Sequence, residues 1–394
     1  MKAERKRFLL AGVAAILACM QFTACSGGTS STGSTSSVSS DGGAQADDVS
    51  AADSSAAEES SDSSTGAMTH EEIIKSAAAE STVGNWGLGN EYEIQALLTK
   101  YGLPADYITQ DFTMDQFDSD SVKLASAMTY NELGLVKNDY DGDGYGDTVS
   151  IIDMNDEGVA MLEDNLFTSK AFAEANPNTV KAFVSASMKG WAYACEHPDE
   201  AAEIVFEAGS SVSSDHQAYM ASEGAKLVTT DMSGNTVSAS DVGNMDEAAM
   251  QQTLDLAKQY IILEDSAAKD KLASLTLDDI RSADYLAYDP AAGGAPEKTS
   301  VSVQLKWLPQ AQFMGYYVAK TKGYYDEVGL DVDIISGGGD ISETTAVYNG
   351  TVDFGVTWVS NLINANAGGM ELLEVAQVYQ RSGLVLVYKK SNYG

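Results

Sequence analysis

The chain has 394 residues, of which 58 are Asp or Glu and 23 are Lys or Arg, giving a formal net charge of −35. Such an acidic chain repels phosphates, so we expect no nucleic-acid partner, whereas the charge suits solubility outside the cell. Two of its three cysteines, Cys19 and Cys25, lie in the first 25 residues, which leaves Cys195 alone after processing. No histidine stands in a metal-ligand spacing with another histidine or a cysteine.

Residues 1–25 are typical of an export signal, with a basic start followed by an apolar run too short to span a membrane comfortably. Small residues precede Cys25, as in a bacterial lipobox, and the product would be a lipoprotein that begins at a lipid-modified Cys25. An ordinary secretory signal is the alternative. We expect an extracytoplasmic protein that is lipid-anchored to the bacterial cell membrane, and residues 26–67, rich in Ser, Gly and acidic residues, should form a disordered spacer.

Residues 68–160 carry the pattern of one lobe of an α/β domain. Alternating apolar residues predict strands at 83–86, 106–112, 125–128 and 148–153. Trp86 ends the first strand and leads through a glycine turn into a helix at 92–101. That turn lacks the Lys-Ser/Thr pair of a phosphate loop. Tyr130 and Glu132 follow the third strand, where an aromatic ring could stack on a heterocycle and a carboxylate could accept its N–H groups.

An acidic loop interrupts this lobe and resembles the first half of an EF-hand. The matching ligand positions are Asp139, Asp141, Asp143 and Asp147. Position 12 is Ser150, where a bidentate Glu is needed. We therefore expect an acidic hairpin tip and no metal site essential to the main function, with weak calcium binding as the alternative.

Helical spacing dominates residues 161–286, which we assign to the helical part of a second lobe. Helices are predicted from Pro177 and at 198–207, 214–226, 246–263 and 277–286. Residues 287–300 contain prolines and adjacent glycines and are predicted to be a connector.

The last part, residues 301–394, is predicted to be the β-α-β part of the second lobe. Strands at 301–306, 332–335 and 352–356 alternate with helices at 312–322 and 342–348. Crossovers of helical length favour parallel strands, and ligands lie beyond the carboxyl ends of such strands. Those ends carry Trp307, a triple glycine followed by Asp340, and Trp358. Two indoles beside a glycine loop without side chains suit a flat ring as ligand. The alternative for each tryptophan is burial in the core.

Several motifs also carry a resemblance. They are KWLPQAQF at 306–313, GYYVA at 315–319, KGYY at 322–325, GLDV at 329–332, DFG at 353–355, AQVYQRSG at 376–383 and YNE at 130–132. The motifs between 306 and 383 resemble, in order and spacing, the solute-binding proteins related to the fungal thiamine-pyrimidine synthases, which serve ABC importers. YNE resembles the ligand-recognition segment of that family. The resemblance implies a two-lobed, periplasmic-binding-protein-like (type II) α/β fold.

The resemblance also implies a function. We expect a monomeric binding protein, with no cofactor and no catalytic residues, that delivers a small heteroaromatic solute to an ABC permease. A thiamine-pyrimidine precursor leads, riboflavin is the alternative ligand, and a thiamine-pyrimidine synthase is the alternative of another class. The candidate ligand-binding residues are Trp86, Asn90, Tyr130, Glu132, Trp307, Gln310, Gln312, Tyr316, Asp340, Trp358 and Gln380.

The segments stand in an order unlike that of the family, whose members start with the Trp307 segment and continue into the Trp86 segment. The chain therefore resembles a circular permutant, with its old ends joined at 287–299 and its new ends near Met68 and Gly394, between the lobes. A truncated tandem array would give the same order.

Overall fold

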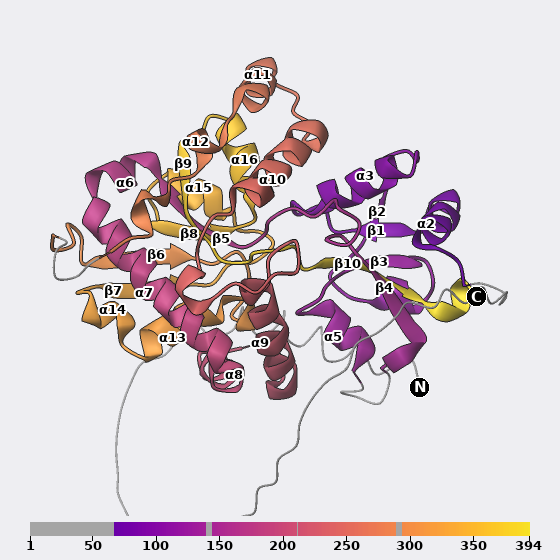
Figure 1. Cartoon of the computed structure of the whole chain (residues 1–394), viewed down its shortest axis with the longest axis horizontal. Helices are drawn as coiled ribbons and strands as arrows, with labels where there is room; N and C mark the ends of the chain where they lie inside the picture. Colours follow the sequence, from indigo (N-terminus) through magenta and orange to yellow (C-terminus); the bar gives the residue numbers. More distant parts are fainter. Residues whose placement is uncertain (1–66, 139–143, 211, 289–293) are drawn as a thin grey trace, which may run out of the picture. The chain divides into compact units, whose positions relative to one another are not determined.

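Two five-stranded sheets organise residues 67–394 (Figure 1). The computed structural model describes residues 67–138, 144–210, 212–288 and 294–394. The strand orders are β2-β1-β3-β10-β4 in one sheet and β7-β6-β8-β5-β9 in the other, and we call the halves built on them lobe A and lobe B. This mixed α/β architecture with two sheets is consistent with the expected two-lobed, periplasmic-binding-like fold.

Lobe A contains the elements before residue 154 and one strand from the C-terminal end. Its elements are α2 (His70–Ala79), β1 (Val83–Asn85), α3 (Glu91–Lys100), β2 (Ile108–Thr109), α4 (Asp115–Asp118), β3 (Leu124–Met128), α5 (Glu132–Lys137), η1 (Gly146–Thr148), β4 (Val149–Asp153), β10 (Leu384–Lys389) and η5 (Lys390–Asn392). A capping box between Thr69 and Glu72 starts α2. Strand β1 pairs in parallel with β2 and β3, so Trp86 follows a carboxyl end as predicted.

Strand β10 corrects the predicted domain boundaries, which placed all of 301–394 in the second lobe. The strand pairs antiparallel with both β3 and β4, and Leu386 stands opposite Ser126 and Ile152. In Figure 1 it runs between these two strands of lobe A. Its continuous apolar run suits a central strand that is buried on both faces, but such a run carries no information about which sheet it joins.

Lobe B contains the remaining elements. They are β5 (Asn165–Ser169), α6 (Lys170–Ala175), α7 (Pro177–Glu196), α8 (Pro198–Glu207), α9 (Ser214–Thr229), η2 (Ala239–Asp241), α10 (Glu247–Tyr260), α11 (Ser266–Ser274), α12 (Leu277–Ile280), η3 (Ala283–Tyr285), β6 (Ser300–Gln304), η4 (Ala311–Phe313), α13 (Met314–Thr321), α14 (Tyr324–Glu327), β7 (Asp331–Ile335), α15 (Glu343–Tyr348), β8 (Phe354–Thr357), α16 (Val359–Ala367) and β9 (Leu372–Gln377). Strand β6 pairs in parallel with β7 and β8, which confirms the predicted β-α-β-α-β unit.

Two further predictions for lobe B are wrong in detail. The part described as helical begins with β5, which pairs antiparallel with β8 and β9. The helix predicted at 277–286 stops at Ile280 because Arg281 becomes extended and forms a bridge with Glu374 of β9. By contrast, α13 ends where predicted, at Gly323 with φ 75°.

Two chain segments, 154–164 and 378–383, connect the sheets within the described part of the chain. They lie against each other, because Asn155 Nδ2 donates to Ser382 O (2.8 Å) and Tyr379 N donates to Asp164 O (3.2 Å). Two adjacent connections of this kind are the arrangement about which lobes can rotate in hinge closure.

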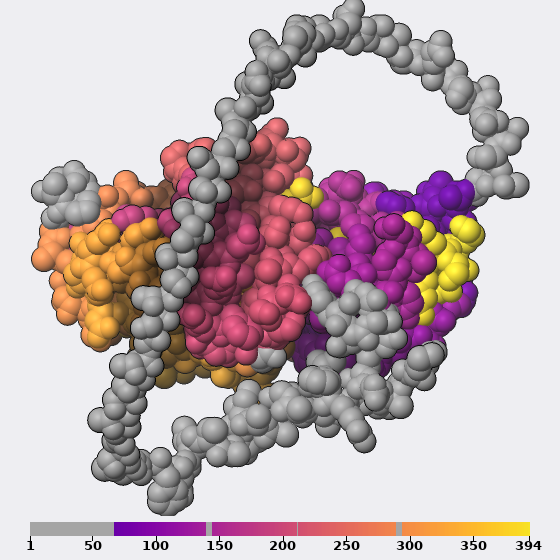
Figure 2. Space-filling model, turned by 90° about the horizontal axis from the view of Figure 1, so that it is seen from below, coloured from indigo at the N-terminus to yellow at the C-terminus, as the bar shows by residue number. Residues whose placement is uncertain are grey.

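The two ends of the described part lie close together in lobe A. Tyr393 lies close to Glu80, at the end of α2. Burial is the main cause that raises the pKa of the Tyr393 phenol, and the charge of the Glu80 carboxylate adds to it. Figure 2 shows the C-terminal residues in yellow beside the indigo residues that follow Ala67. We expected the ends to lie between the lobes, but the structure places both ends in lobe A. Circular permutation itself stays a prediction.

Several predictions lie outside the described residues. These are the export signal, Cys25, the spacer before Ala67, Asp139, Asp141 and Asp143 of the acidic loop, and residues 289–293 of the connector. Within the described ranges, no helix is long and apolar enough to cross a membrane. Those ranges also hold no group of three His, Cys, Asp or Glu side chains arranged for a metal ion.

Candidate functional site between the two lobes

A cavity of about 60 Å³ lies where the two lobes meet. Its lining comes from the strand ends of both sheets. Lobe A contributes Trp86, Leu88, Phe112, Met128, Tyr130, Asn131 and Glu132, and lobe B contributes Lys306, Trp307, Gln310, Gln312 and Trp358. Seven of the eleven predicted ligand-binding residues are therefore brought together, as expected for carboxyl ends that share one rim.

Aromatic rings form the rim of the cavity. Trp307 follows β6, and its ring lies 5.3 Å from that of Phe112 of lobe A, at 55° between the planes. The backbone of Gly339 lies beside the Trp307 ring, where an added Cβ would be 3.6 Å away. The Trp86 indole donates to Asp111 O at 3.0 Å. The ring faces thus come from both lobes, and Trp307 and Phe112 meet across the boundary between them.

Lys306 and Trp358 form part of the lobe B wall of the cavity. The Lys306 ammonium lies 4.4 Å from the centre of the Trp358 ring and 3.5 Å from Glu343 Oε1. Thr357 Oγ1 also donates to that carboxylate. A desolvated cation over an indole face is a favourable arrangement. The Trp358 indole N–H lies close to Asp164 and acts to lower the pKa of that carboxyl, against the larger effect of burial.

A chain of polar side chains runs from the cavity into lobe B. Gln310 Nε2 donates to Gln312 Oε1 at 2.7 Å, and Gln312 Nε2 donates to Asp164 Oδ2 at 2.8 Å. Asp164 precedes β5, and its Oδ1 is buried without a partner among the described residues. Burial raises the pKa of Asp164 to about 7, opposed by the Gln312 hydrogen bond and by the Lys306 charge.

The Tyr130-Asn131-Glu132 segment lines lobe A's side of the cavity. Tyr130 is 2% exposed and packs edge-on against Tyr379. Glu132 accepts from Met128 N (2.9 Å) and from Asn131 Nδ2 (2.8 Å), so it stabilises the turn from β3 to α5. Burial raises the pKa of Glu132. The carboxylate is therefore a half-buried residue of the cavity wall.

The structure does not bring four predicted residues to the cavity. Tyr316 is fully buried against Trp191 in the core of lobe B, and Asp340 is exposed on the loop after β7. Asn90 accepts from Asn85 Nδ2 behind the cavity wall. Gln380 donates to Asn244 O and Gln377 O in the second connection between the lobes. Sequence spacing predicted their neighbourhood but not the direction of their side chains.

Five lining residues were missed. Leu88, Phe112, Met128, Asn131 and Lys306 line the cavity without having been predicted. Asn131 and Lys306 stand inside motifs that were singled out, so adjacency to Tyr130 and Trp307 was a usable signal. Phe112 is the last residue of the strand predicted at 106–112, so its position at a strand end was also a usable signal. In the structure its side chain is 56% exposed. Leu88 and Met128 gave no signal beyond ordinary apolar character.

Buried carboxyls make the stability depend on pH in a defined direction. Burial raises the pKa of Glu93 to about 8, of Asp164 to about 7 and of Glu374 to about 8. The folded state then holds protons that the unfolded chain has released, so stability falls as pH rises towards these values. Burial lowers the pKa of His216 to about 4, which acts in the opposite direction but only below its ordinary pKa of 6.5.

We therefore expect the protein to be less stable at pH 8 than at pH 6.5, by on the order of 1 kcal/mol for each buried carboxyl. Urea unfolding at the two pH values measures the difference. Glu374→Gln should remove the contribution of that carboxyl, so the free energy of unfolding should change less between pH 6.5 and pH 8. A Glu374→Gln curve with the wild-type slope would contradict this explanation.

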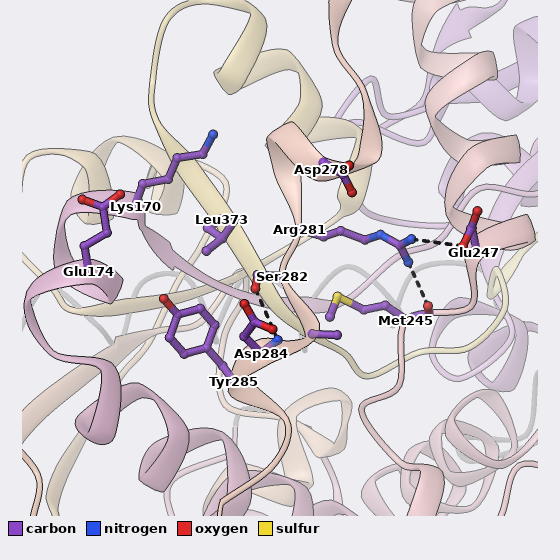
Figure 3. A pocket seen from close by; sticks show the side chains of 11 residues that line it. Lys170, Glu174, Met245, Glu247, Asp278, Arg281, Ser282, Asp284, Tyr285 and Leu373 are labelled. Atoms are coloured by element: carbon purple, nitrogen blue, oxygen red, sulfur yellow. Dashed lines mark hydrogen bonds and ion pairs between the residues drawn. The ribbon is translucent and has the colours of Figure 1, made fainter. Parts of the chain in front are cut away.

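A second hollow, of about 640 Å³, lies on lobe B (Figure 3). Its lining residues are Lys170, Glu174, Met245, Glu247, Asp278, Arg281, Ser282, Ala283, Asp284, Tyr285 and Leu373. The Arg281 guanidinium already donates to Met245 O (2.9 Å) and lies 3.8 Å from Glu247. The hollow is larger than the inter-lobe cavity, but its walls come from one lobe and mix opposite charges, with one aromatic ring. The inter-lobe cavity is therefore the candidate site for a flat ring.

Comparison with known proteins adds a family and distant relatives. The NMT1/THI5 like family matches residues 78–201 and 310–393, more than half of the chain. The 4-amino-5-hydroxymethyl-2-methylpyrimidine phosphate synthase THI11 of Saccharomyces cerevisiae is 27% identical over 92 residues, 23% of this chain and 27% of the synthase. The riboflavin-binding protein RibY of Chloroflexus aurantiacus is 30% identical over 105 residues, 26% of this chain and 30% of RibY.

The aligned part thus spans less than a third of each of these two relatives. The family match is broader and covers residues of both lobes, including Trp86, Tyr130 and Gln312 of the cavity wall. Motifs that the sequence analysis used, such as those at 315–319 and 376–383, also fall inside it. The chain belongs to the NMT1/THI5-like family.

Proposed function

We propose that the protein is a solute-binding protein that captures a small heteroaromatic molecule between its two lobes. The observation that carries the proposal is the inter-lobe cavity, where ring faces and a few polar groups from both sheets converge. The name of the riboflavin-binding relative RibY agrees with a binding role. The paired connections at 154–164 and 378–383 supply a hinge.

The lobes must separate for the solute to enter. A volume of about 60 Å³ holds about two waters, whereas ligand cavities are on the order of 300–1,000 Å³. Contacts such as Ser360 Oγ to Gly89 O (2.5 Å), Asn361 Nδ2 to Leu88 O (3.1 Å) and Tyr219 OH to Thr129 O (2.7 Å) hold the lobes closed. Opening exchanges such polar contacts for water and separates the Trp307 and Phe112 rings.

The solute that we favour is a thiamine-pyrimidine precursor, with riboflavin as the alternative. Isothermal titration with 4-amino-5-hydroxymethyl-2-methylpyrimidine, thiamine and riboflavin is the direct test. We expect saturable binding of one of them, at one site per chain. Absence of binding by the whole panel, in protein that unfolds cooperatively, would reject the proposal.

A synthase is the alternative function, because THI11 and THI13 of Saccharomyces cerevisiae are synthases by name. We propose instead that this chain binds its solute without transforming it and hands it to an ABC permease. Mass spectrometry after prolonged incubation should recover the solute unchanged. Conversion of the solute, or of a residue of the chain, into a pyrimidine phosphate would favour the enzyme.

We also propose that Cys25 carries a lipid that holds the protein on the outer side of the cell membrane. The support is the basic, apolar and small-residue pattern that precedes it. Cys25→Ser should move the protein from the membrane fraction to the medium or leave the precursor uncleaved. Membrane-bound and correctly processed Cys25→Ser protein would exclude lipidation at this residue.

The unusual segment order leads us to propose circular permutation. The proximity of Tyr393 to Glu80 supports it, since a short linker could join the described ends. A rearranged chain that begins at Thr299, continues through a linker from Gly394 to Thr69 and ends at Tyr288 should fold and bind the same solute. Failure of this rearranged chain to fold would favour the tandem-array alternative.

A further inference from the structure

Asp164 occupies an unusual place behind the cavity wall. It is 1% exposed, and the charge of Lys306 acts on it without a hydrogen bond between the two among the described contacts. Instead it accepts from Gln312, which in turn accepts from Gln310. We call Asp164, Gln312 and Gln310 the amide relay. Of the three, the two glutamines line the cavity and Asp164 does not.

The charge on Asp164 determines the orientation of both amides. A carboxylate only accepts hydrogen bonds, so Gln312 must direct its NH₂ group towards Asp164. Its oxygen then faces Gln310, which must direct its own NH₂ group towards Gln312. Turning either amide over would bring two acceptors or two donors together in a buried place, which is costly.

We propose that Asp164 is a positioning residue that sets the hydrogen-bond polarity of the cavity, so that Gln310 Oε1 is presented to the solute as an acceptor. Gln310 Oε1 accepts no hydrogen bond from the described residues, whereas its Nε2 is engaged by Gln312. The inference rests on the proposed function and names the solute class more closely. The favoured solute is an aromatic ring that carries an exocyclic amino group, whose N–H meets this oxygen.

The hydrogen-bond polarity of the Gln310 amide should discriminate between two pyrimidines that have the same shape but different donors and acceptors along one edge. A 4-aminopyrimidine presents an N–H donor beside a ring-nitrogen acceptor, and the 4-oxo analogue presents an acceptor beside an N–H donor. A glutamine amide edge matches an amino group and a neighbouring ring nitrogen, as it does with adenine. Turning the 4-oxo ring over would restore the match but would move its other substituents to opposite sides of the closed cavity.

Asp164 must be ionised for the relay to hold, and its pKa of about 7 makes pH 8 the suitable condition. The titratable groups that act on it or stand close to it are Lys306, Glu343, Glu163, Tyr130, Tyr379 and Tyr316. Of these, Lys306 favours the ionised form and Glu343 opposes it.

The test is titration at pH 8 with 4-amino-5-hydroxymethyl-2-methylpyrimidine and its 4-oxo analogue. We expect wild type to prefer the amino compound by about tenfold or more, the cost of one unpaired buried group. Asp164→Asn lets the relay run in either direction and should reduce the preference to less than about threefold. The ratio of the two affinities reports polarity, which a merely structural role of Asp164 would not change.

Glu374→Gln is the matched control, because it replaces another fully buried carboxyl of lobe B outside the cavity and should keep the wild-type ratio. If Asp164→Asn does not fold, Gln312→Met breaks the relay at its middle and should give the same loss of preference. Wild-type binding with an unchanged ratio in the relay variants overturns this inference alone. Wild-type protein that binds neither pyrimidine and no other ring of the panel overturns the proposed function, and this inference with it.

Discussion

Replacing Trp307 with alanine should weaken solute binding by at least about thirtyfold. Truncation of a buried aromatic anchor often costs about 2 kcal/mol or more, and about 1.4 kcal/mol corresponds to tenfold. Trp307 is such an anchor because it follows β6 at the cavity rim and packs on Phe112 of the other lobe. Its loss removes both a ring face for the solute and a contact that closes the lobes.

Isothermal titration measures this effect without relying on indole fluorescence, which the variant would itself change. Phe206→Ala is the matched control, since Phe206 is an aromatic residue of lobe B that is 45% exposed and lies outside the cavity lining. Its affinity should equal that of wild type. Unchanged affinity in folded Trp307→Ala protein would falsify stacking at this rim and move the site elsewhere.

Replacing Gly190 with alanine should destabilise the protein by about 2 kcal/mol or more, although alanine favours helices over glycine by about 1 kcal/mol. Helices α7 and α13 pack so closely that a Cβ at Gly190 would lie 2.2 Å from Gly315 O and 2.7 Å from Ala319 Cβ. A backbone oxygen cannot rotate away as a side chain can, so the helices must separate.

Urea unfolding of Gly190→Ala measures that cost. Ser185→Ala, five residues earlier on α7 and partly exposed, is the control and should differ from wild type by less than about 0.5 kcal/mol. Because α13 directly follows the Gln310–Gln312 segment, we also expect weaker solute binding in Gly190→Ala protein that remains folded. A variant as stable as wild type would mean that the two helices separate freely.

Local sequence patterns were sufficient to predict most elements and the position of the cavity. Strand and helix periodicities depend on neighbouring residues, so β6, β7, β8 and the helices between them were found from their own residues. Helical crossovers then required parallel strands, and parallel strands placed Trp307 and Trp358 at one rim. Both indoles were therefore expected at the same side of the sheet, because both follow parallel strands.

Other features were decided by contacts between residues far apart in the chain. The apolar run of β10 indicates a buried strand, but only its pairing with β3 and β4 assigns it to lobe A. Tyr316 and Trp307 look alike as aromatic residues beside one motif, yet Tyr316 turns into the core and Trp307 turns to the cavity. Tyr316 lies on α13, where packing decides which face is buried, whereas Trp307 lies in the loop after β6.

The sequence by itself therefore determined the α/β elements, the parallel unit of lobe B and the aromatic rim, because each depends on local periodicity or on the lengths of connections. Only the tertiary structure decided that Phe112 meets Trp307 and that Asp164 supports the Gln310 and Gln312 amides. Asp164 lies almost 150 residues before Gln312 in the chain. No local pattern records such a contact, because the energy that selects it comes from burial and hydrogen bonding after both lobes have assembled.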